Sequence, residues 1–171
     1  MLKTVPWLKG FGGMIVSEKD TDIMKLNVDE LKQCLAKDKA IMLRGFDTNH
    51  EIFKKFTDQF SKKFLLHFSP HVRPNMGDDA TITGVLIGNE RVHLHGEMNY
   101  SPVRPEILFL HCTIPSAVGG ETTLCDGRAF YLALPEELKK LFESKIKCVI
   151  DTDFYHCILP GISLVINITK M

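Results

Sequence analysis

The sequence has no excess of charge of either sign. Its 21 Lys and Arg residues equal its 21 Asp and Glu residues, so the formal net charge is zero. A nucleic-acid-binding domain needs a cationic surface for phosphates, and we therefore expect no nucleic-acid partner. Long apolar runs and the three zones of a signal peptide are also absent. We therefore expect a cytoplasmic protein without membrane attachment.

Closely spaced cysteine pairs are missing too. The odd set of five is Cys34, Cys112, Cys125, Cys148 and Cys157. This spacing is typical of reduced cytosolic thiols and disfavours a structural zinc site. The P-loop, the dinucleotide fingerprint and the G-x-S-x-G elbow are absent as well. Their absence disfavours a phosphate-cradling loop and α/β-hydrolase chemistry.

Helix signals are concentrated in the first third of the chain. The 171 residues are 44% apolar and 25% charged, which suits one domain with a substantial core. Asn27 and Glu30 predict a capped helix that carries Leu31 and Leu35 on its apolar face. A second capped helix is predicted from Thr48, with an aromatic stripe that packs on a sheet. The stripe consists of Ile52, Phe53, Phe56, Phe60 and Phe64.

Short strands dominate the remainder. They are predicted at residues 40–43, 81–87, 107–113, 145–150 and 162–168, with extended chain at 121–125. A short helix is predicted at 128–134, and another begins near Pro135. Residues 1–19 are predicted to be loop or sheet-edge material, and residues 67–80 are predicted to be an exposed loop. Helices early in the chain and many short strands after them predict an α+β, mainly β domain with flanking helices.

The segment His93-Leu94-His95-Gly96-Glu97 contains the pattern with the clearest chemical meaning. If it is extended, His93, His95 and Glu97 share one face, because side chains alternate along a strand. An imidazole and a carboxylate can bind one divalent metal ion. The His-x-Asp/Glu pair is two-thirds of the facial triad of non-haem Fe(II) oxygenases. Such a tripeptide also arises by chance, so the flanking sequence decides its meaning.

Several motifs flank this pair in a fixed order. They are residues 41–46 (IMLRGF), 95–102 (HGEMNYSP), 104–105 (RP), 108–110 (LFL), 112 (C), 115 (P), 119–123 (GGETT) and 126–128 (DGR). Together they resemble the taurine dioxygenase-like family, and most closely its clavaminate synthase-like branch. The resemblance spans residues 35–145.

The resemblance implies a fold, a cofactor set and a reaction class. The fold would be a double-stranded β-helix, a jelly-roll barrel with iron at its mouth. The resemblance assigns His95 and Glu97 as Fe(II) ligands and places Thr122 at the carboxylate of the cosubstrate 2-oxoglutarate. A small amino-acid-like or sulfonate-like substrate is implied. Because Glu97 is a carboxylate, hydroxylation or desaturation is favoured over halogenation.

Other polar residues near the motif have two readings each. Arg91, His93, Asn99 and Arg104 are candidate substrate contacts, or they are structural residues that hold the loops. In a cupin-like metalloenzyme without 2-oxoglutarate, His93 would instead be a further ligand. His111, inside an apolar strand, is predicted to be a core histidine. Arg44 is predicted to be a structural arginine, held by a carboxylate or a carbonyl.

The family pattern stops near residue 154. We therefore divide the chain into residues 1–154, the N-terminal part of an oxygenase-like domain, and residues 155–171, an atypical tail. The distal His ligand and the 2-oxoglutarate-binding Arg of the family are not found in this chain. An active enzyme would then need a homo-oligomer or a completing chain. The alternative is a non-catalytic truncated relative that acts as a binding or interaction domain.

Overall fold

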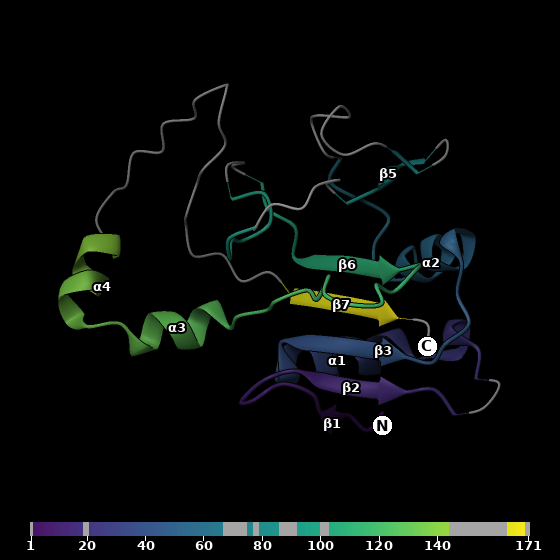
Figure 1. Cartoon of the computed structure of the whole chain (residues 1–171), viewed down its shortest axis with the longest axis horizontal. Coiled ribbons are helices and arrows are strands. Elements are labelled where there is room, and N and C mark those ends of the chain that lie inside the picture. Colours follow the sequence, from purple (N-terminus) through teal and green to yellow (C-terminus); the bar gives the residue numbers. More distant parts are fainter. Residues whose placement is uncertain are drawn as a thin grey trace.

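The computed structural model describes residues 2–18, 21–66, 75–76, 79–85, 92–99 and 103–143, and the backbone of residues 164–169. Its main feature is a five-stranded sheet with the strand order β1-β2-β3-β7-β6 (Figure 1). The strands are β1 (Val5–Pro6), β2 (Gly13–Val16), β3 (Ala40–Arg44), β6 (Ile107–Cys112) and β7 (Leu164–Thr169). The edge strand β1 is antiparallel to β2, and every other pairing in the sheet is parallel.

The first parallel pair is joined through η1 (Ile23–Lys25) and α1 (Val28–Asp38). Asn27 caps α1, because its side-chain oxygen accepts a hydrogen bond from the Glu30 amide at 3.0 Å. The Glu30 carboxylate accepts from the Leu2 amide at 2.7 Å, which ties the N-terminal segment to α1. The predicted helix and the strand after it are thus confirmed.

The helix α2 (His50–Thr57) is capped by Asn49, whose side chain accepts from the Ile52 amide at 2.8 Å. The prediction of a longer helix starting at Thr48 was wrong in its bounds. The helix ends at Thr57, so Phe60 and Phe64 follow it in the chain. The packing prediction holds for Phe60 nevertheless, because the turn after the helix brings that ring into the core.

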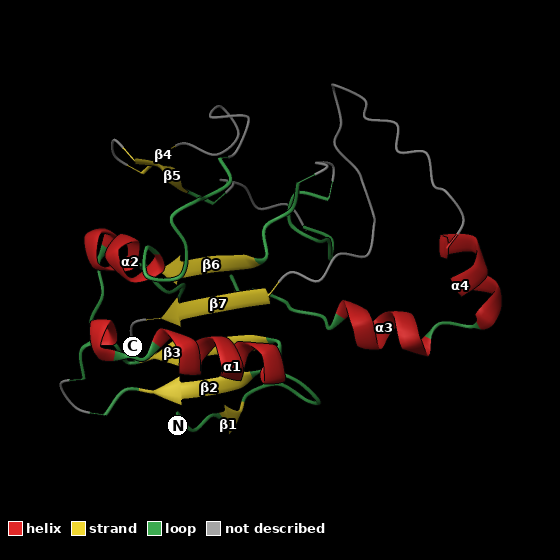
Figure 2. Cartoon of the chain, turned by 180° about the vertical axis from the view of Figure 1, so that it is seen from behind, coloured by secondary structure: helices red, strands yellow, loops and turns green. Residues whose placement is uncertain are grey.

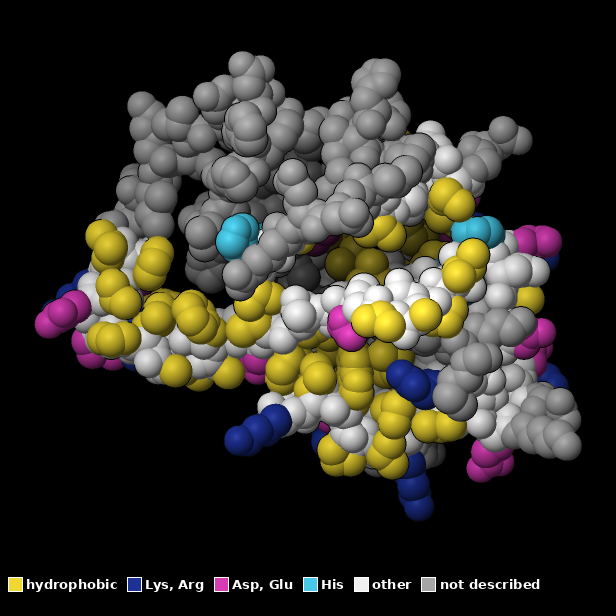
Figure 3. All heavy atoms as spheres, viewed as in Figure 1, with side chains coloured by type: hydrophobic (Ala, Val, Ile, Leu, Met, Phe, Trp, Pro, Cys, Tyr) yellow, Lys and Arg dark blue, Asp and Glu magenta, His cyan; other side chains and the backbone are white. Residues whose placement is uncertain are grey.

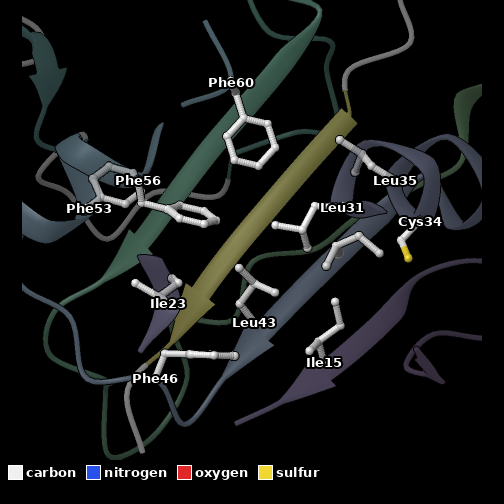
Figure 4. Close-up of a cluster of buried hydrophobic side chains, with 11 residues drawn as sticks. Ile15, Ile23, Leu31, Cys34, Leu35, Leu43, Phe46, Phe53, Phe56 and Phe60 are labelled. Atoms are coloured by element: carbon white, nitrogen blue, oxygen red, sulfur yellow. The ribbon is translucent and has the colours of Figure 1, made fainter. Parts of the chain in front are cut away.

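The core lies between η1, α1 and α2 on one side and one face of the sheet on the other (Figures 2 and 4). Its buried members come from β2, η1, α1, β3, α2 and the two turns that follow β3 and α2. They are Ile15, Ile23, Leu31, Cys34, Leu35, Ile41, Leu43, Phe46, Phe53, Phe56 and Phe60. The strand β3 is buried from Ala40 to Leu43, as expected for a strand inside a parallel sheet.

Outside the main sheet lie a hairpin and two helices. The hairpin pairs β4 (Asn75–Met76) with β5 (Asp79–Thr83). The helices α3 (Gly127–Ala133) and α4 (Glu136–Glu143) extend away from the sheet and bury none of their residues (Figure 1). Apolar side chains gather on their surface in Figure 3, and Phe130 and Leu132 are among the exposed ones.

Several sequence predictions need correction. Residues 13–16 form the inner strand β2, although residues 1–19 were predicted to be loop or edge. The strand was not predicted because Gly12 and Gly13 indicate a turn, as glycine does in most sequences. The predicted strand at 145–150 and most of the predicted loop at 67–80 lie outside the described residues.

The α+β class is confirmed. The described strands form an open, mostly parallel sheet and a hairpin, and they do not close into a barrel. None of the helices in the described part of the chain is long and apolar enough to span a bilayer. The predicted terminal strand at 162–168 is present as β7, in the interior of the sheet.

Candidate metal site

The residues of the His-x-Glu motif lie in an irregular segment. Residues 92–96 form no strand, and residues 97–99 form a turn in which the Asn99 amide donates to the Gly96 carbonyl at 3.3 Å. Met98 adopts a φ of 54°, in the left-handed region. The strict alternation of an extended strand therefore ends before Glu97. The prediction that His93, His95 and Glu97 share one face does not extend to Glu97.

His95 has one ring nitrogen fixed by a hydrogen bond. Its Nδ1 lies 2.7 Å from the backbone carbonyl oxygen of His93. A carbonyl can only accept, so Nδ1 carries the proton and the neutral ring has its lone pair on Nε2. Metal-binding histidines commonly donate their second ring N–H to a carbonyl in this way. His95 is exposed, so Nε2 can reach a metal ion from solvent.

Gly96 and Asn99 form the base of the same turn. Asn99 is only 6% exposed, and a Cβ on Gly96 would lie 2.6 Å from both its Nδ2 and its Oδ1 atoms. No side chain fits at position 96 unless Asn99 moves. Asn99 therefore shapes the turn that joins His95 to the half-buried Glu97.

The Gly-Gly-Glu-Thr motif has a backbone that requires both of its glycines. Gly119 and Gly120 have φ values of 74° and 77°. A Cβ on Gly120 would also lie 2.7 Å from the Ser116 Oγ atom. Thr122 is exposed just beyond this turn, so its hydroxyl is accessible to a small molecule. Arg104 is exposed as well, between the metal motif and β6.

The structure does not bring together a complete set of metal ligands. Among the described residues there is no group of three or more His, Cys, Asp or Glu side chains that could hold a metal ion. His93 is exposed and contributes its carbonyl to the His95 ring. Arg91 lies outside the described residues.

A second histidine cluster was only partly foreseen. His111 on β6 pairs through Nε2 with the Thr48 hydroxyl at 2.9 Å, and its ring stacks on Phe53 with centroids 5.0 Å apart. The His50 ring meets the His111 ring edge-on, with the ring centroids 5.9 Å apart. Burial lowers the pKa of His111, and the neighbouring His50 lowers it further. The half-buried His111 thus behaves as predicted for a core histidine, while the partners at 48, 50 and 53 were not foreseen.

Comparison with known protein families resolves the origin of these motifs. The model of the family described as "Taurine catabolism dioxygenase TauD, TfdA family" matches residues 9–155. The chain belongs to this family. Neither a curated protein nor a solved structure matches the chain significantly.

Membership of the TauD/TfdA family places the chain in the superfamily of Fe(II)- and 2-oxoglutarate-dependent dioxygenases. Dioxygenases of this family typically use Fe(II) and 2-oxoglutarate. The match includes the metal motif and the Gly-Gly-Glu-Thr motif, and it ends before β7. The resemblance read from the motifs at residues 35–145 is therefore confirmed at the level of the family.

Proposed function

We propose that this TauD/TfdA-family chain is an Fe(II)- and 2-oxoglutarate-dependent oxygenase-type protein, with His95 and Glu97 as two of the iron ligands. The observation that carries the proposal is the 2.7 Å contact between His95 Nδ1 and the His93 carbonyl. It leaves Nε2 as the acceptor atom, which is the protonation state that a metal ligand needs.

The donor set fits iron as a half-site. One imidazole nitrogen and one carboxylate are two members of the 2-His-1-carboxylate triad that binds Fe(II) in such oxygenases. The third ligand would come from a second copy or from a completing chain. A jelly-roll barrel in the complete protein is part of the same proposal, as implied by the family.

The remaining residues would bind and orient the small molecules. The accessible Thr122 hydroxyl would donate a hydrogen bond to a carboxylate of 2-oxoglutarate, and the Gly119-Gly120 turn would set its position. When bound, the iron and 2-oxoglutarate supply the oxidising chemistry. The residues of this chain provide a fixed imidazole, a carboxylate and a hydroxyl donor.

The proposed substrate is a small molecule of amino-acid-like or sulfonate-like character. Arg91 and Arg104 would provide the cations that pair with its carboxylate or sulfonate, since a guanidinium can donate two hydrogen bonds to two oxygens of either anion. His93 and Asn99 are further candidates for contact. Glu97 retains the carboxylate, so hydroxylation or desaturation is the proposed outcome.

An anaerobic titration with Fe(II) and 2-oxoglutarate tests the proposal. We expect the weak visible charge-transfer band of the chelate, and we expect His95→Ala and Glu97→Ala to abolish it. His50→Ala is the matched control, because it removes an exposed imidazole far from the motif in sequence. His93→Ala distinguishes the cupin-like alternative, since it deletes a side chain while the carbonyl that holds His95 remains.

Two outcomes would contradict the proposal. A band of equal strength in the wild type and in His95→Ala would exclude His95 as a ligand. No band in any variant, together with no succinate formation from 2-oxoglutarate in air, would favour the alternative function, a non-catalytic relative that acts as a binding domain.

A further inference from the structure

The last strand of the chain occupies the interior of the main sheet. On one side β7 pairs with β3 from Ala40↔Val165 to Arg44↔Thr169, and on the other it pairs with β6 from Ile107↔Leu164 to Cys112↔Thr169. Both ladders are parallel and both run along the full shared length of the strands. The family match ends at residue 155, so β7 is not part of the matched region.

Without β7 the strands β3 and β6 would have no sheet neighbour in common. Each would then present a row of unpaired backbone N–H and C=O groups toward the gap. The β3 edge belongs to a strand that is buried from Ala40 to Leu43, where unpaired polar groups cost the most free energy. The gap between β3 and β6 therefore has the backbone chemistry of a binding site for one more strand.

The side chains around this gap are apolar. Ile41 and Leu43, which lie opposite Ile166 and Ile168 in register, are completely buried in the core. On the other side, Phe109 is packed against the same core cluster and lies opposite Ile166. Figure 4 shows β7 between β6 and β3, with the core side chains of the helices gathered around its path.

We infer that β3 and β6 form a strand-binding slot, and that residues 164–169 are an extended peptide ligand for it, carried on the same chain. The slot accepts one apolar strand parallel to both of its walls. The sequence Leu-Val-Ile-Asn-Ile-Thr suits it, because it has no charge and is rich in β-branched residues, which favour strands. Strand addition of this kind recognises a peptide mainly through its main chain.

The ligand is joined to the rest of the protein through residues 144–163 alone. A proteolytic cut there separates the ligand from the slot covalently without altering either of them. We therefore expect the full chain, with a specific protease sequence inserted between residues 152 and 153, to keep its C-terminal fragment after cutting. The fragment should co-elute with the body in native size-exclusion chromatography and separate from it only in denaturant.

Exchange of the fragment for a synthetic peptide tests the recognition. A labelled peptide of residues 159–171 should replace the cut fragment, and a scrambled peptide of the same composition should not. In a parallel strand, consecutive residues direct their N–H groups to opposite neighbours. N-methylation at Ile166 and N-methylation at Asn167 should each weaken binding about tenfold, since each removes one interstrand hydrogen bond.

The two N-methylated peptides separate insertion into the slot from attachment to a sheet edge. An edge strand has one neighbour, so only one of the two modifications would weaken binding, and that result would overturn the inference. Release of the cut fragment under native conditions would also overturn it.

Hydrogen exchange on the intact chain gives an independent check. The amides of residues 164–169 should be protected like those of β3, and exchange at the rate of an unfolded peptide would refute the slot. None of these measurements involves Fe(II) or 2-oxoglutarate, so they test the slot independently of the proposed oxygenase function.

Discussion

The rings of Phe60 and Phe109 meet edge to face, with centroids 5.2 Å apart and an angle of 68° between their planes. Phe60 follows α2, and Phe109 lies on β6, so this contact joins the helical layer to the far strand of the sheet. Edge-to-face pairs of this kind contribute about 0.5–1.5 kcal/mol beyond the apolar area that they bury.

Replacement of Phe60 by Ala should therefore destabilise the fold strongly. Phe60 is 9% exposed, and truncation of a buried Phe lowers the free energy of unfolding by about 3–5 kcal/mol. Phe130→Ala is the matched control, because Phe130 is 60% exposed on α3 and its loss should change stability by less than about 0.5 kcal/mol. Urea denaturation of both variants measures the difference. Equal effects of the two substitutions would show that Phe60 is not part of the core.

The pKa of His111 makes stability dependent on pH. Its folded-state pKa lies below the ordinary value of 6.5, because burial and then His50 disfavour the charged ring. The unfolded chain therefore takes up the proton first as the pH falls through 6.5, and the folded state loses stability from that point downward. Thermal unfolding between pH 7.5 and 5 should show a falling midpoint.

The contribution of His111 is separated by substitution. His111→Leu removes the titrating ring, so the midpoint of this variant should fall less steeply over the same pH range. His95→Leu is the comparison, because it deletes an exposed histidine that is not packed into the core. A wild-type profile that is flat between pH 7.5 and 5, or identical slopes for wild type and His111→Leu, would contradict the role of burial.

Gly96→Ala should impair the candidate metal site, although it replaces neither of the two proposed ligands. The new Cβ would lie 2.6 Å from the side-chain atoms of Asn99, so the turn between His95 and Glu97 must shift. We expect at least a tenfold loss of Fe(II) affinity, measured by the same anaerobic titration. The double variant Gly96→Ala/Asn99→Ala relieves the clash and should regain part of that loss. An unchanged affinity in the single variant would show that this turn does not position the ligands.

Two other glycines provide a matched pair for backbone strain. Gly120 has a φ of 77° and a Ser116 oxygen at 2.7 Å from the place of a Cβ, whereas Gly127 has no atom within 4 Å of that place. Gly120→Ala should lower the free energy of unfolding by about 1–3 kcal/mol. Gly127→Ala, at the first residue of α3, should leave stability unchanged or raise it by up to about 1 kcal/mol. Chemical denaturation of both variants gives the comparison, and a reversed order would exclude the left-handed turn.

Local signals predicted the local structure well where they acted within a few residues. Asn27 and Asn49 cap their helices because a short side chain reaches amides three positions along the chain. The end of α2 was misplaced because the apolar spacing continues to Phe64, while the helix stops at Thr57. The spacing of the aromatic residues at 60 and 64 fits both a continued helix and packing into the core. Phe60 packs into the core without being part of the helix.

For the candidate site, the sequence indicated which residues could bind a metal, and the structure showed their backbone geometry and hydrogen bonds. The spacing of His95 and Glu97 indicated a metal pair, but the turn at Glu97 and the hydrogen bond of His95 Nδ1 to the His93 carbonyl depend on backbone geometry. The contact of His111 with Thr48 joins residues 63 positions apart, and no periodicity along the chain encodes it.

By itself the sequence determined the family, the helix caps and the apolar character of the strands, and it indicated candidate residues for iron and 2-oxoglutarate. These properties follow from side-chain chemistry and short-range spacing. The tertiary structure decided the order of the strands, above all the place of β7 between β3 and β6. A strand pattern predicts that a segment pairs with other strands, but it does not identify those strands. The partners of a parallel strand depend on long-range packing against the common core.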